Sequence, residues 1–421
     1  MTASAVLTQR PRARSVGSRL SESGRWSLLV LALSVLGRMA ITFGIPSGLN
    51  MVDLRVYTYG AQALMTGTLY SFTYADLTPD FPLPFTYPPF AAILMLPLHL
   101  LPSFAVLGVL WQLATIAAVW AAVRLSLTLM LGPVAADPRW RSAALLWTAL
   151  GVWLEPVRTT LNFGQVNVFL VVGILLAANA GRGRWWLAGG LVGLLAGVKL
   201  TPAITGLYLV GRRNVRAAVL AGAVFVGTVA ISFVLIPLES GAYFGGLVID
   251  AGRVGPVGSA INQSMRGALS RIVGHDVGTG GLWLSAVVLA CLLALLAWFR
   301  LDRDDRLGML LVVQLLGLLV SPISWSHHWV WLLPAAMWLV HGPLGRELGA
   351  RLVAAMMLVI LAADPISLLL VLQPSIWEFS RPWPLSVAGS VYPVIAVVVL
   401  ALMVRGEHRQ ATVAPARSGD G

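Results

Sequence analysis

Long apolar runs recur along this chain and constrain its fold more than any other feature of the sequence. Four of them, at 26–45, 215–238, 281–299 and 352–372, approach the roughly 20 residues that a helix needs to cross a bilayer. Of the 421 residues, 58% are hydrophobic and only 11% are charged, which leaves too little polar surface to enclose such runs in a soluble core. The sequence therefore predicts an all-α integral membrane protein.

The first apolar run follows five arginines, an arrangement that a secretory signal peptide shares. The run at 26–45 is longer than the roughly 7–15 apolar residues of such a peptide, and no convincing small-residue cleavage site follows it. We therefore expect an uncleaved first span.

Basic residues dominate the charge of the chain, whose formal net charge is +12. Twenty of the 29 lysines and arginines lie in the two tails or in five short connections between apolar runs. Positive charge in short connections marks the cytoplasmic side of a membrane protein, so the excess indicates topology and attraction to anionic lipid rather than a nucleic-acid partner. Both termini are therefore expected in the cytoplasm. The five connections are 132–141, 181–184, 212–216, 300–306 and 342–351.

Thirteen apolar stretches can be counted, but two cytoplasmic tails require an even number of crossings. The stretch at 88–101 has only 14 residues and contains Pro97, so we assign it to an interfacial or re-entrant segment. The stretch at 202–211 is shorter, but it preserves the alternation of basic connections and is kept. We predict about 12 transmembrane helices. Two long outer loops, at 46–87 and 239–280, are expected to cap the bundle and roof a cavity.

Asp53 opens the first of these loops, at the boundary of a chain that avoids charge almost everywhere else. Apolar residues recur at helical spacing over 52–64, which predicts an amphipathic helix with Asp53 near its N-terminus. Asp53 could serve only as the N-cap of this helix. A carboxylate that is ionised at neutral pH can instead accept a proton from a hydroxyl group during nucleophilic attack.

Three side chains could bind an anion on the same side. Lys199 is the only lysine of the chain, against 28 arginines, and either snorkels to the interface or contacts a phosphate. His327 and His328 are adjacent between two apolar runs. No third histidine or cysteine is close and Cys291 lies alone in an apolar run, so hydrogen bonds to a phosphate or sugar are favoured over a metal site.

Amide and aromatic side chains also gather in the outer connections. The run 161–167 holds Asn162, Gln165 and a third amide, which could cap helices or bind a hydroxyl-rich ligand. Tyr87 precedes a Pro-Pro pair that could be only a rigid helix start, although the same corner suits stacking on a sugar ring. In the second loop, Arg266 could hold a phosphate bidentately or be an ordinary surface residue.

The set contains one carboxylate with several cationic and amide donors. Such a set suits transfer of a sugar from a lipid phosphate to a hydroxyl, because a phosphate leaving group is stable as an anion and needs positive charge rather than a general acid. A glycosidase would need a second carboxylate. No Gly-rich phosphate loop or dinucleotide fingerprint is visible, which disfavours a nucleotide-sugar donor.

Five segments of the chain carry a specific resemblance to a known family. They lie at 52–57, 78–92, 197–205, 250–256 and 321–331, the last containing Ser-Pro-Ile-Ser-Trp and His-His-Trp-Val-Trp. These segments resemble the mycobacterial polyprenol-phosphate-mannose-dependent α-1,2-mannosyltransferases of phosphatidylinositol mannoside synthesis. The resemblance runs from about residue 26 to residue 404.

The resemblance implies a GT-C glycosyltransferase fold with an active site under the outer loops. It divides the chain into a cytoplasmic basic tail at 1–25, a transmembrane catalytic domain at 26–404 and a cytoplasmic tail at 405–421. The donor would be polyprenyl-phosphate mannose, and the acceptor a tetramannosylated phosphatidylinositol mannoside that is extended towards the hexamannosylated form. The α-1,2 linkage would form with inversion on the periplasmic face of the plasma membrane.

Residue roles follow from the resemblance and from charge. The catalytic aspartate of the family corresponds to Asp53, and its paired histidines correspond to His327 and His328, with a role in binding the donor phosphate. Our charge argument adds Lys199 and Arg266 to the phosphate site. No cofactor or metal is expected, and no divalent cation is required. The residues expected to bind acceptor or sugar are Tyr57, Tyr87, Asn162, Gln165, Asn262, Trp325 and Trp377.

Other functions fit parts of the pattern. A related GT-C mannosyltransferase could act on lipomannan or lipoarabinomannan. A lipid or sugar transporter would place charge near the middle of the membrane, whereas only Arg38, Arg124 and Asp364 lie within predicted spans. A scaffold protein of the cell envelope would not need the lone carboxylate.

Overall fold

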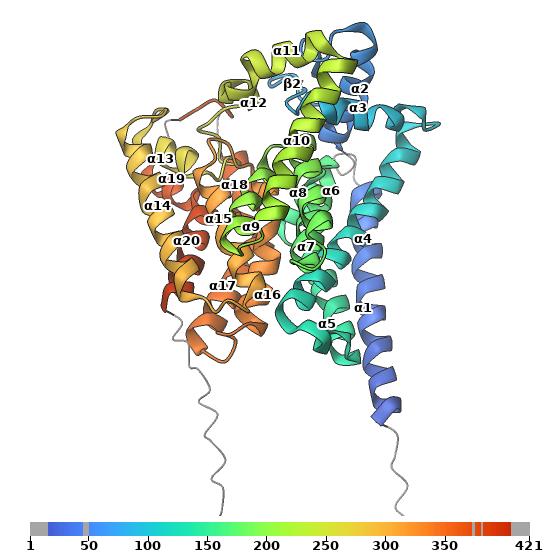
Figure 1. The fold of residues 1–421 in the computed structure, drawn as a ribbon, viewed down its shortest axis with the longest axis vertical. Coiled ribbons are helices and arrows are strands. Elements are labelled where there is room, and N and C mark those ends of the chain that lie inside the picture. The colour runs from blue at the N-terminus through green and yellow to red at the C-terminus, as the bar shows by residue number, and fades with distance from the viewer. Residues whose placement is uncertain (1–15, 45–49, 373–374, 380–381, 406–421) are drawn as a thin grey trace, which may run out of the picture.

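Helices run side by side through most of the molecule (Figure 1). Many of them carry large apolar side chains that are exposed. The computed structural model describes residues 16–44, 50–372, 375–379 and 382–405. Among these residues, five helical segments are long and apolar enough to cross a membrane, or six if one bent helix pair is counted as a span. The prediction of an all-α membrane protein is confirmed. The longest helices are α1 (Val16–Gly44), α4 (Phe104–Leu131), α10 (Val215–Leu235) and α14 (Gly281–Arg300).

Shorter helices complete the bundle. Three of them, together with the segment Pro89–Leu100, are apolar but have only 10–17 residues, so the count of 12 crossings stays a prediction. The shorter helices are α5 (Pro138–Gly151), α6 (Glu155–Phe163), α7 (Asn167–Ala180), α8 (Trp185–Val198), α9 (Thr205–Gly211), α15 (Arg306–Val320), α16 (Leu332–His341), α17 (Leu348–Ala363), α18 (Pro365–Val371), α19 (Trp383–Ala388) and α20 (Val391–Arg405).

The first and last helices share one end of the molecule. Helix α1 begins, and helix α20 ends, at the lower end in Figure 1. This arrangement agrees with an even number of crossings. The predicted tails, 1–25 and 405–421, fall largely outside the described residues.

The two long loops fold over the opposite end of the bundle, as predicted. The first contains α2 (Val52–Ala63), η1 (Leu64–Thr66) and a small antiparallel hairpin of β1 (Thr73–Tyr74) and β2 (Leu83–Pro84). It leads into α3 (Pro89–Met95) and η2 (Leu96–Leu100), which form the short segment that we excluded from the spans. The second contains α11 (Pro237–Gly245), η5 (Leu247–Ile249), α12 (Ala251–Val254) and α13 (Met265–Val273).

Arg253 joins these two loops. Its guanidinium donates hydrogen bonds of 2.8 Å and 2.7 Å to the backbone carbonyls of Phe85 and Tyr70. It also lies over the ring of Tyr70. The second loop is therefore fixed to the first by a charged side chain that satisfies buried backbone acceptors.

Helices α6 and α7 meet at a sharp corner. Helix α6 is inclined by 119° to α7. Gly164 ends α6 with a φ of +69°, and a Cβ atom at this position would lie 2.6 Å from the Leu54 Cβ atom. Only glycine combines this backbone conformation with such a close approach, so the corner packs directly against α2.

The charges within predicted spans are all partnered. Arg38 donates to the Asn162 side chain, and Arg124 donates to the backbone carbonyl of Ala135. Asp364 pairs with Arg158 and caps α18, because the predicted span at 352–372 breaks there into α17 and α18. Such pairing and capping accounts for these charges without a transport pathway.

Candidate active site

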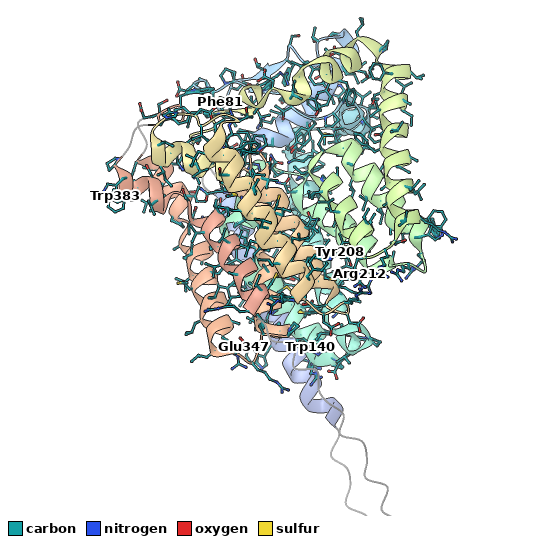
Figure 2. All side chains as sticks on the ribbon, turned by 60° about the vertical axis from the view of Figure 1, so that its left-hand side comes forward. Phe81, Trp140, Tyr208, Arg212, Glu347 and Trp383 are labelled. Carbon is teal, nitrogen blue, oxygen red and sulfur yellow. The ribbon has the colours of Figure 1, made fainter. Side chains whose placement is uncertain are left out.

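A cavity of about 520 Å³ lies under the two loops. Its walls come from both loops and from the corners that join bundle helices on this side. Figure 2 shows Phe81, which lines this cavity, at the end of the molecule opposite Trp140 and Glu347. The polar side chains that line it include Asp53, Thr86, Tyr87, Gln165, Lys199, Thr201, Asp250, Ser321, His327 and His328.

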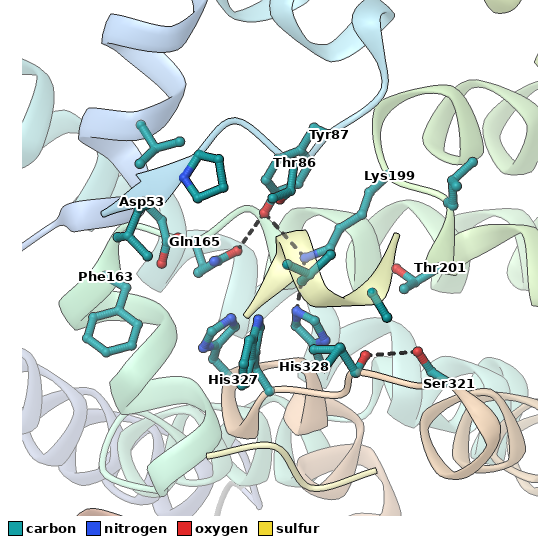
Figure 3. A pocket seen from close by; sticks show the side chains of 18 of the residues that line it. Asp53, Thr86, Tyr87, Phe163, Gln165, Lys199, Thr201, Ser321, His327 and His328 are labelled. Carbon is teal, nitrogen blue, oxygen red and sulfur yellow. Dashed lines mark hydrogen bonds between the residues drawn. The ribbon is translucent and has the colours of Figure 1, made fainter. Parts of the chain in front are cut away.

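Asp53 lies in the first turn of α2 and does not cap the helix. The N-cap position is taken by Met51, whose φ of +45° is unusual for a residue with a side chain. Asn50 accepts the hydrogen bond from the Val52 amide at 3.0 Å instead. The capping explanation for Asp53 is therefore excluded, and its carboxylate faces the cavity (Figure 3).

The Gln165 amide orients Asp53. Its carbonyl oxygen lies 2.8 Å from the Tyr57 hydroxyl and 3.1 Å from the Tyr87 hydroxyl, and both donate to it. With the oxygen held in this way, the amide group forms a side-chain hydrogen bond with the Asp53 carboxylate. Gln165 stands at the corner between α6 and α7, so the sharp bend places it beside α2.

Burial dominates the electrostatics of Asp53. Burial raises the pKa of the Asp53 carboxyl to about 6, although the Gln165 hydrogen bond and the charge of Lys199 oppose this rise. The carboxylate is therefore mostly ionised at neutral pH and more basic than an ordinary aspartate. This is the range that suits a general base.

The described hydrogen-bond partners of the Lys199 ammonium group are all neutral. Its Nζ atom lies 2.8 Å from the Asn167 Oδ1 atom, 3.2 Å from the His328 Nε2 atom and 3.4 Å from the Tyr87 hydroxyl. Burial lowers the pKa of Lys199 to about 7, while the charge of Asp53 acts in the opposite direction. An anion bound beside Lys199 would stabilise the charged form.

The histidine pair leaves ring nitrogens without partners. His328 accepts from Lys199 at Nε2, because an ammonium group can only donate, so the proton of the neutral ring lies on Nδ1. Neither this Nδ1 atom nor the His327 Nε2 atom makes a hydrogen bond within the described part of the chain, although both are buried. Burial and the charge of Lys199 hold the pKa of both rings well below the ordinary value. Two buried ring nitrogens next to a cation are therefore available for hydrogen bonds to a ligand.

The pocket has two chemically different sides. Figure 3 shows Asp53 on one side and Lys199 on the other, with Gln165 and Tyr87 between them and the two histidine rings below. A basic carboxylate thus faces an anion-binding group across a space lined by hydroxyl, amide and aromatic groups. This arrangement fits a ligand with a sugar in the middle and an anionic group at one end.

A second cavity of about 340 Å³ adjoins the first and shares Leu200, Thr201, Ser321 and His328 with it. It extends between α7 and α15, and most of its walls are apolar. The apolar wall residues are Leu170, Val171, Ile174, Ile204, Leu318, Val320 and Val330.

The structure brings seven of the twelve predicted site residues to the first cavity and leaves five outside it. The seven are Asp53, Tyr87, Gln165, Lys199, Trp325, His327 and His328; the five are Tyr57, Asn162, Asn262, Arg266 and Trp377.

Arg266 is separated from the predicted phosphate site. Its guanidinium donates two hydrogen bonds, of 3.0 Å and 2.7 Å, to the carboxylate of Asp276, which lies in the loop after α13. Trp377 is 51% exposed and contacts the cavity only through the edge of Phe81. Neither residue lines the cavity.

Three polar residues predicted to bind sugar stabilise the walls instead. Tyr57 is fully buried behind Gln165, and Asn162 accepts from Arg38 and from the Met51 amide. The Asn262 side chain accepts from the Ser264 and Ser324 amides and thereby ties the second loop to the segment that carries Trp325.

Two residues of the site were not predicted from the sequence. Asn167 accepts a hydrogen bond from Lys199 and donates one of 2.8 Å to the His327 backbone carbonyl, so it links Lys199 to the histidine segment. The amide-rich run 161–167 was the only signal for it. Asp250 is a second carboxylate of the cavity; it caps α12 and is exposed.

The described residues contain no group of three or more His, Cys, Asp or Glu side chains that could hold a metal ion. The donor set of the cavity consists of a lysine, neutral imidazoles, amides and hydroxyls around one buried carboxylate. It therefore favours an anionic, hydroxyl-rich ligand.

Fold and site together define a multi-pass, all-α membrane protein whose one cavity holds a buried carboxylate together with a lysine and two histidines. The family model described as glycosyltransferase family 87 matches residues 85–322, and the chain belongs to this family of glycosyltransferases.

Curated relatives match almost the whole chain. The chain is 50% identical to the polyprenol-phosphate-mannose-dependent alpha-(1-2)-phosphatidylinositol pentamannoside mannosyltransferase of Mycobacterium tuberculosis, over 94% of this chain and 91% of the relative. The protein of the same name from Mycolicibacterium smegmatis is 49% identical over 94% of each chain. A Mycobacterium tuberculosis phosphatidylinositol mannoside mannosyltransferase with the same donor dependence is 34% identical over 93% of each chain. No solved structure matches the chain.

Proposed function

We propose that this enzyme transfers mannose from polyprenyl-phosphate mannose to a phosphatidylinositol mannoside, with an α-1,2 linkage and inversion at the anomeric carbon. The names of the relatives at 49% and 50% identity support both substrates. The single observation that carries the proposal is the cavity itself, where one buried carboxylate, Asp53, faces Lys199 and the unpartnered nitrogens of His327 and His328.

Asp53 acts as the general base. The acceptor hydroxyl oxygen attacks the anomeric carbon, and a new carbon–oxygen bond forms while the bond to the phosphate oxygen breaks. The hydroxyl proton passes to the Asp53 carboxylate, and the electron pair of the broken bond leaves with polyprenyl phosphate. Because the attack comes from the face opposite the leaving group, the anomeric configuration inverts.

Lys199 and the two histidines bind the donor phosphate. The Lys199 ammonium and the protonated Nδ1 atom of His328 can donate to phosphate oxygens, and their contribution grows as charge develops on the leaving group. Asn167 holds Lys199 in place from behind. Arg266 has no part in this site, since Asp276 binds its guanidinium.

The second cavity would receive the first isoprene units of the donor. It begins at His328 and Thr201, next to the proposed phosphate site, and its walls are largely aliphatic. Burial of an isoprenoid there would contribute about 25 cal/mol for each Å² of apolar surface removed from water. Tyr87 and Trp325, which line the first cavity, would stack on the sugars.

The acceptor would enter from the periplasmic side of the plasma membrane. This side is supported by the basic connections, which gather at the other end of the bundle, as is usual for a cytoplasmic face, while the cavity lies under the loops at the opposite end. The relatives at 49% and 50% identity are named for a phosphatidylinositol pentamannoside, which supports an acceptor that already carries several mannoses. A lipomannan-type acceptor is the alternative that product analysis must exclude.

The test uses membranes that contain the enzyme, radiolabelled polyprenyl-phosphate mannose and a tetramannosylated phosphatidylinositol mannoside. The expected product gains labelled mannose, loses it on digestion with α-1,2-mannosidase and shows the α configuration by NMR. Label in a polymeric glycan but not in the glycolipid would move the proposal to another acceptor. Label that resists the mannosidase would contradict the linkage.

A further inference from the structure

A basic pocket of about 840 Å³ lies apart from the active site and shares no lining residue with either of its two cavities. It is built where three helix pairs turn, α7 into α8, α9 into α10 and α14 into α15. Five arginines line it, at positions 182, 212, 213, 303 and 306, together with one acidic residue, Asp304. Figure 2 shows Arg212 and Tyr208 of this pocket well away from Phe81.

The positive charge of this pocket is not neutralised within the described residues. The ion pairs between described residues involve Arg139, Arg158 and Arg266, and none of these arginines lines the pocket. Asp305, on the same loop, does not line the pocket but lies near Tyr208; its carboxylate accepts from the Trp338 indole and the Gly308 amide. Of the charged side chains that line the pocket, five are therefore positive and one is negative.

Helix dipoles do not account for this excess. Each of the three turns joins the C-terminus of one helix to the N-terminus of the next, so the partial charges of about −0.5 and +0.5 offset each other. Arg182 and Arg212 donate to backbone carbonyls of the turns, which satisfies acceptors but leaves the guanidinium charge in place. Arg213 and Arg303 are exposed, and their side chains make no hydrogen bond or ion pair with the residues that the structure describes.

The pocket also borders the lipid-facing surface. Val210 on α9 and Phe299 on α14 line it and are 56% and 75% exposed. Both belong to apolar helices of the bundle, so acyl chains would contact them. A ligand that satisfies the pocket therefore needs an anionic group at one end and an apolar body at the other.

We propose that this pocket binds the headgroup of an anionic glycerophospholipid, with its acyl chains along the exposed apolar faces of α9 and α14. Arg213 and Arg303 contact the phosphodiester, while Arg182 and Arg212 keep the turns in shape. The positive-inside pattern alone would give basic turns, but it does not require them to surround one cavity that borders exposed apolar helix faces. The inference is independent of the proposed transferase activity.

The experiment measures lipid binding to the purified full chain in neutral detergent by native mass spectrometry, with dioleoyl phosphatidylglycerol as the probe and dioleoyl phosphatidylcholine for comparison. The double variant R213Q/R303Q should bind phosphatidylglycerol about thirtyfold more weakly, which corresponds to two contacts of about 1 kcal/mol each. The variant Asp304→Asn should bind it several-fold more tightly. A variant that had failed to fold would not bind the lipid more tightly, so this result cannot be due to misfolding.

The matched control is R184Q/R216Q, which removes the same charge from two exposed arginines at the same turns that do not line the pocket. It should leave binding within about twofold of the unmodified chain. Equal loss in both double variants would show diffuse attraction and overturn the proposal, as would equal binding of the two lipids. Complete displacement of the lipid by millimolar inorganic phosphate would show a free-anion site and overturn the lipid assignment.

Discussion

The pH dependence of the reaction follows from the two buried groups that face each other across the cavity. Asp53 must be ionised to accept a proton, and Lys199 must be charged to bind the phosphate. Burial raises the pKa of Asp53 to about 6 and lowers the pKa of Lys199 to about 7. Activity is therefore lost as the pH falls through about 6 and again as it rises through about 7. The free enzyme should be most active near pH 6.5, in a narrow range.

The size of each limb can be worked out. One pH unit below the pKa of Asp53, about a tenth of the carboxylate is ionised, and one unit above that of Lys199, about a tenth of the ammonium remains. In a plot of kcat/KM, which reports ionisations of the free enzyme, we expect values about sixfold below the maximum at pH 5 and at pH 8. The donor's phosphodiester keeps its single charge throughout this range and contributes no limb.

The variant Lys199→Arg separates the two groups. A guanidinium stays protonated over the whole range, so the alkaline limb should disappear while the acid limb, due to Asp53, remains. The shape of the profile decides the question, since the altered geometry can lower the absolute rate. The assay is initial-rate mannosyl transfer from radiolabelled donor at limiting concentration between pH 4.5 and 9. An alkaline limb that persists in Lys199→Arg would refute the assignment to this residue.

Three further predictions test individual parts of the site. Gln165→Leu removes the hydrogen bond that lowers the pKa of Asp53, so the acid limb of kcat/KM should move to higher pH; an unchanged limb would contradict the orienting role. Arg266→Gln should leave the donor KM within about twofold, because Asp276 already binds that guanidinium, whereas a tenfold rise measured in the same assay would return Arg266 to the phosphate site. Gly255→Ala should destabilise the fold by about 1–3 kcal/mol, because the φ of +144° is strained for alanine and its Cβ atom would lie under 3 Å from two aromatic rings. Thermal unfolding in detergent measures this loss, and an unchanged midpoint would refute it.

Much of the site could be predicted because topology alone brought its parts to one side. Asp53, Lys199 and the pair His327–His328 lie far apart in the sequence, yet alternating basic connections assign all of them to the outer face. The structure places all four in one cavity. Their rarity in a chain of 11% charged residues made them visible against an apolar background.

Five predicted site residues do not line the cavity because their partners could not be predicted from the sequence. The charge of Arg266 was visible, but its partner Asp276 becomes a neighbour only through the fold of the loop after α13. Asn262 and Tyr57 have polar groups that could bind a sugar, but Asn262 accepts hydrogen bonds from backbone amides and Tyr57 donates one to Gln165. Which hydrogen bonds a polar side chain makes depends on tertiary contacts that spacing along the chain does not encode.

Helix ends were also difficult to predict. The corner between α6 and α7 depends on one glycine in close contact with Leu54, and the break between α17 and α18 depends on capping by Asp364. The break at Asp364 interrupts the apolar run at 352–372, whose hydropathy is otherwise continuous. Span counting by apolar length therefore predicts the class of fold better than the number of crossings.

The most direct test of the account compares two carboxylates of the same cavity. Asp53→Asn keeps the size of the buried side chain but removes the base, and mannosyl transfer should fall by about 10²–10⁴-fold while thermal stability and donor binding are retained. Asp250→Asn removes the exposed carboxylate and should leave the rate within about threefold. A near-normal rate for Asp53→Asn in a folded enzyme, above all with a large loss for Asp250→Asn, would contradict the central claim that Asp53 is the catalytic base.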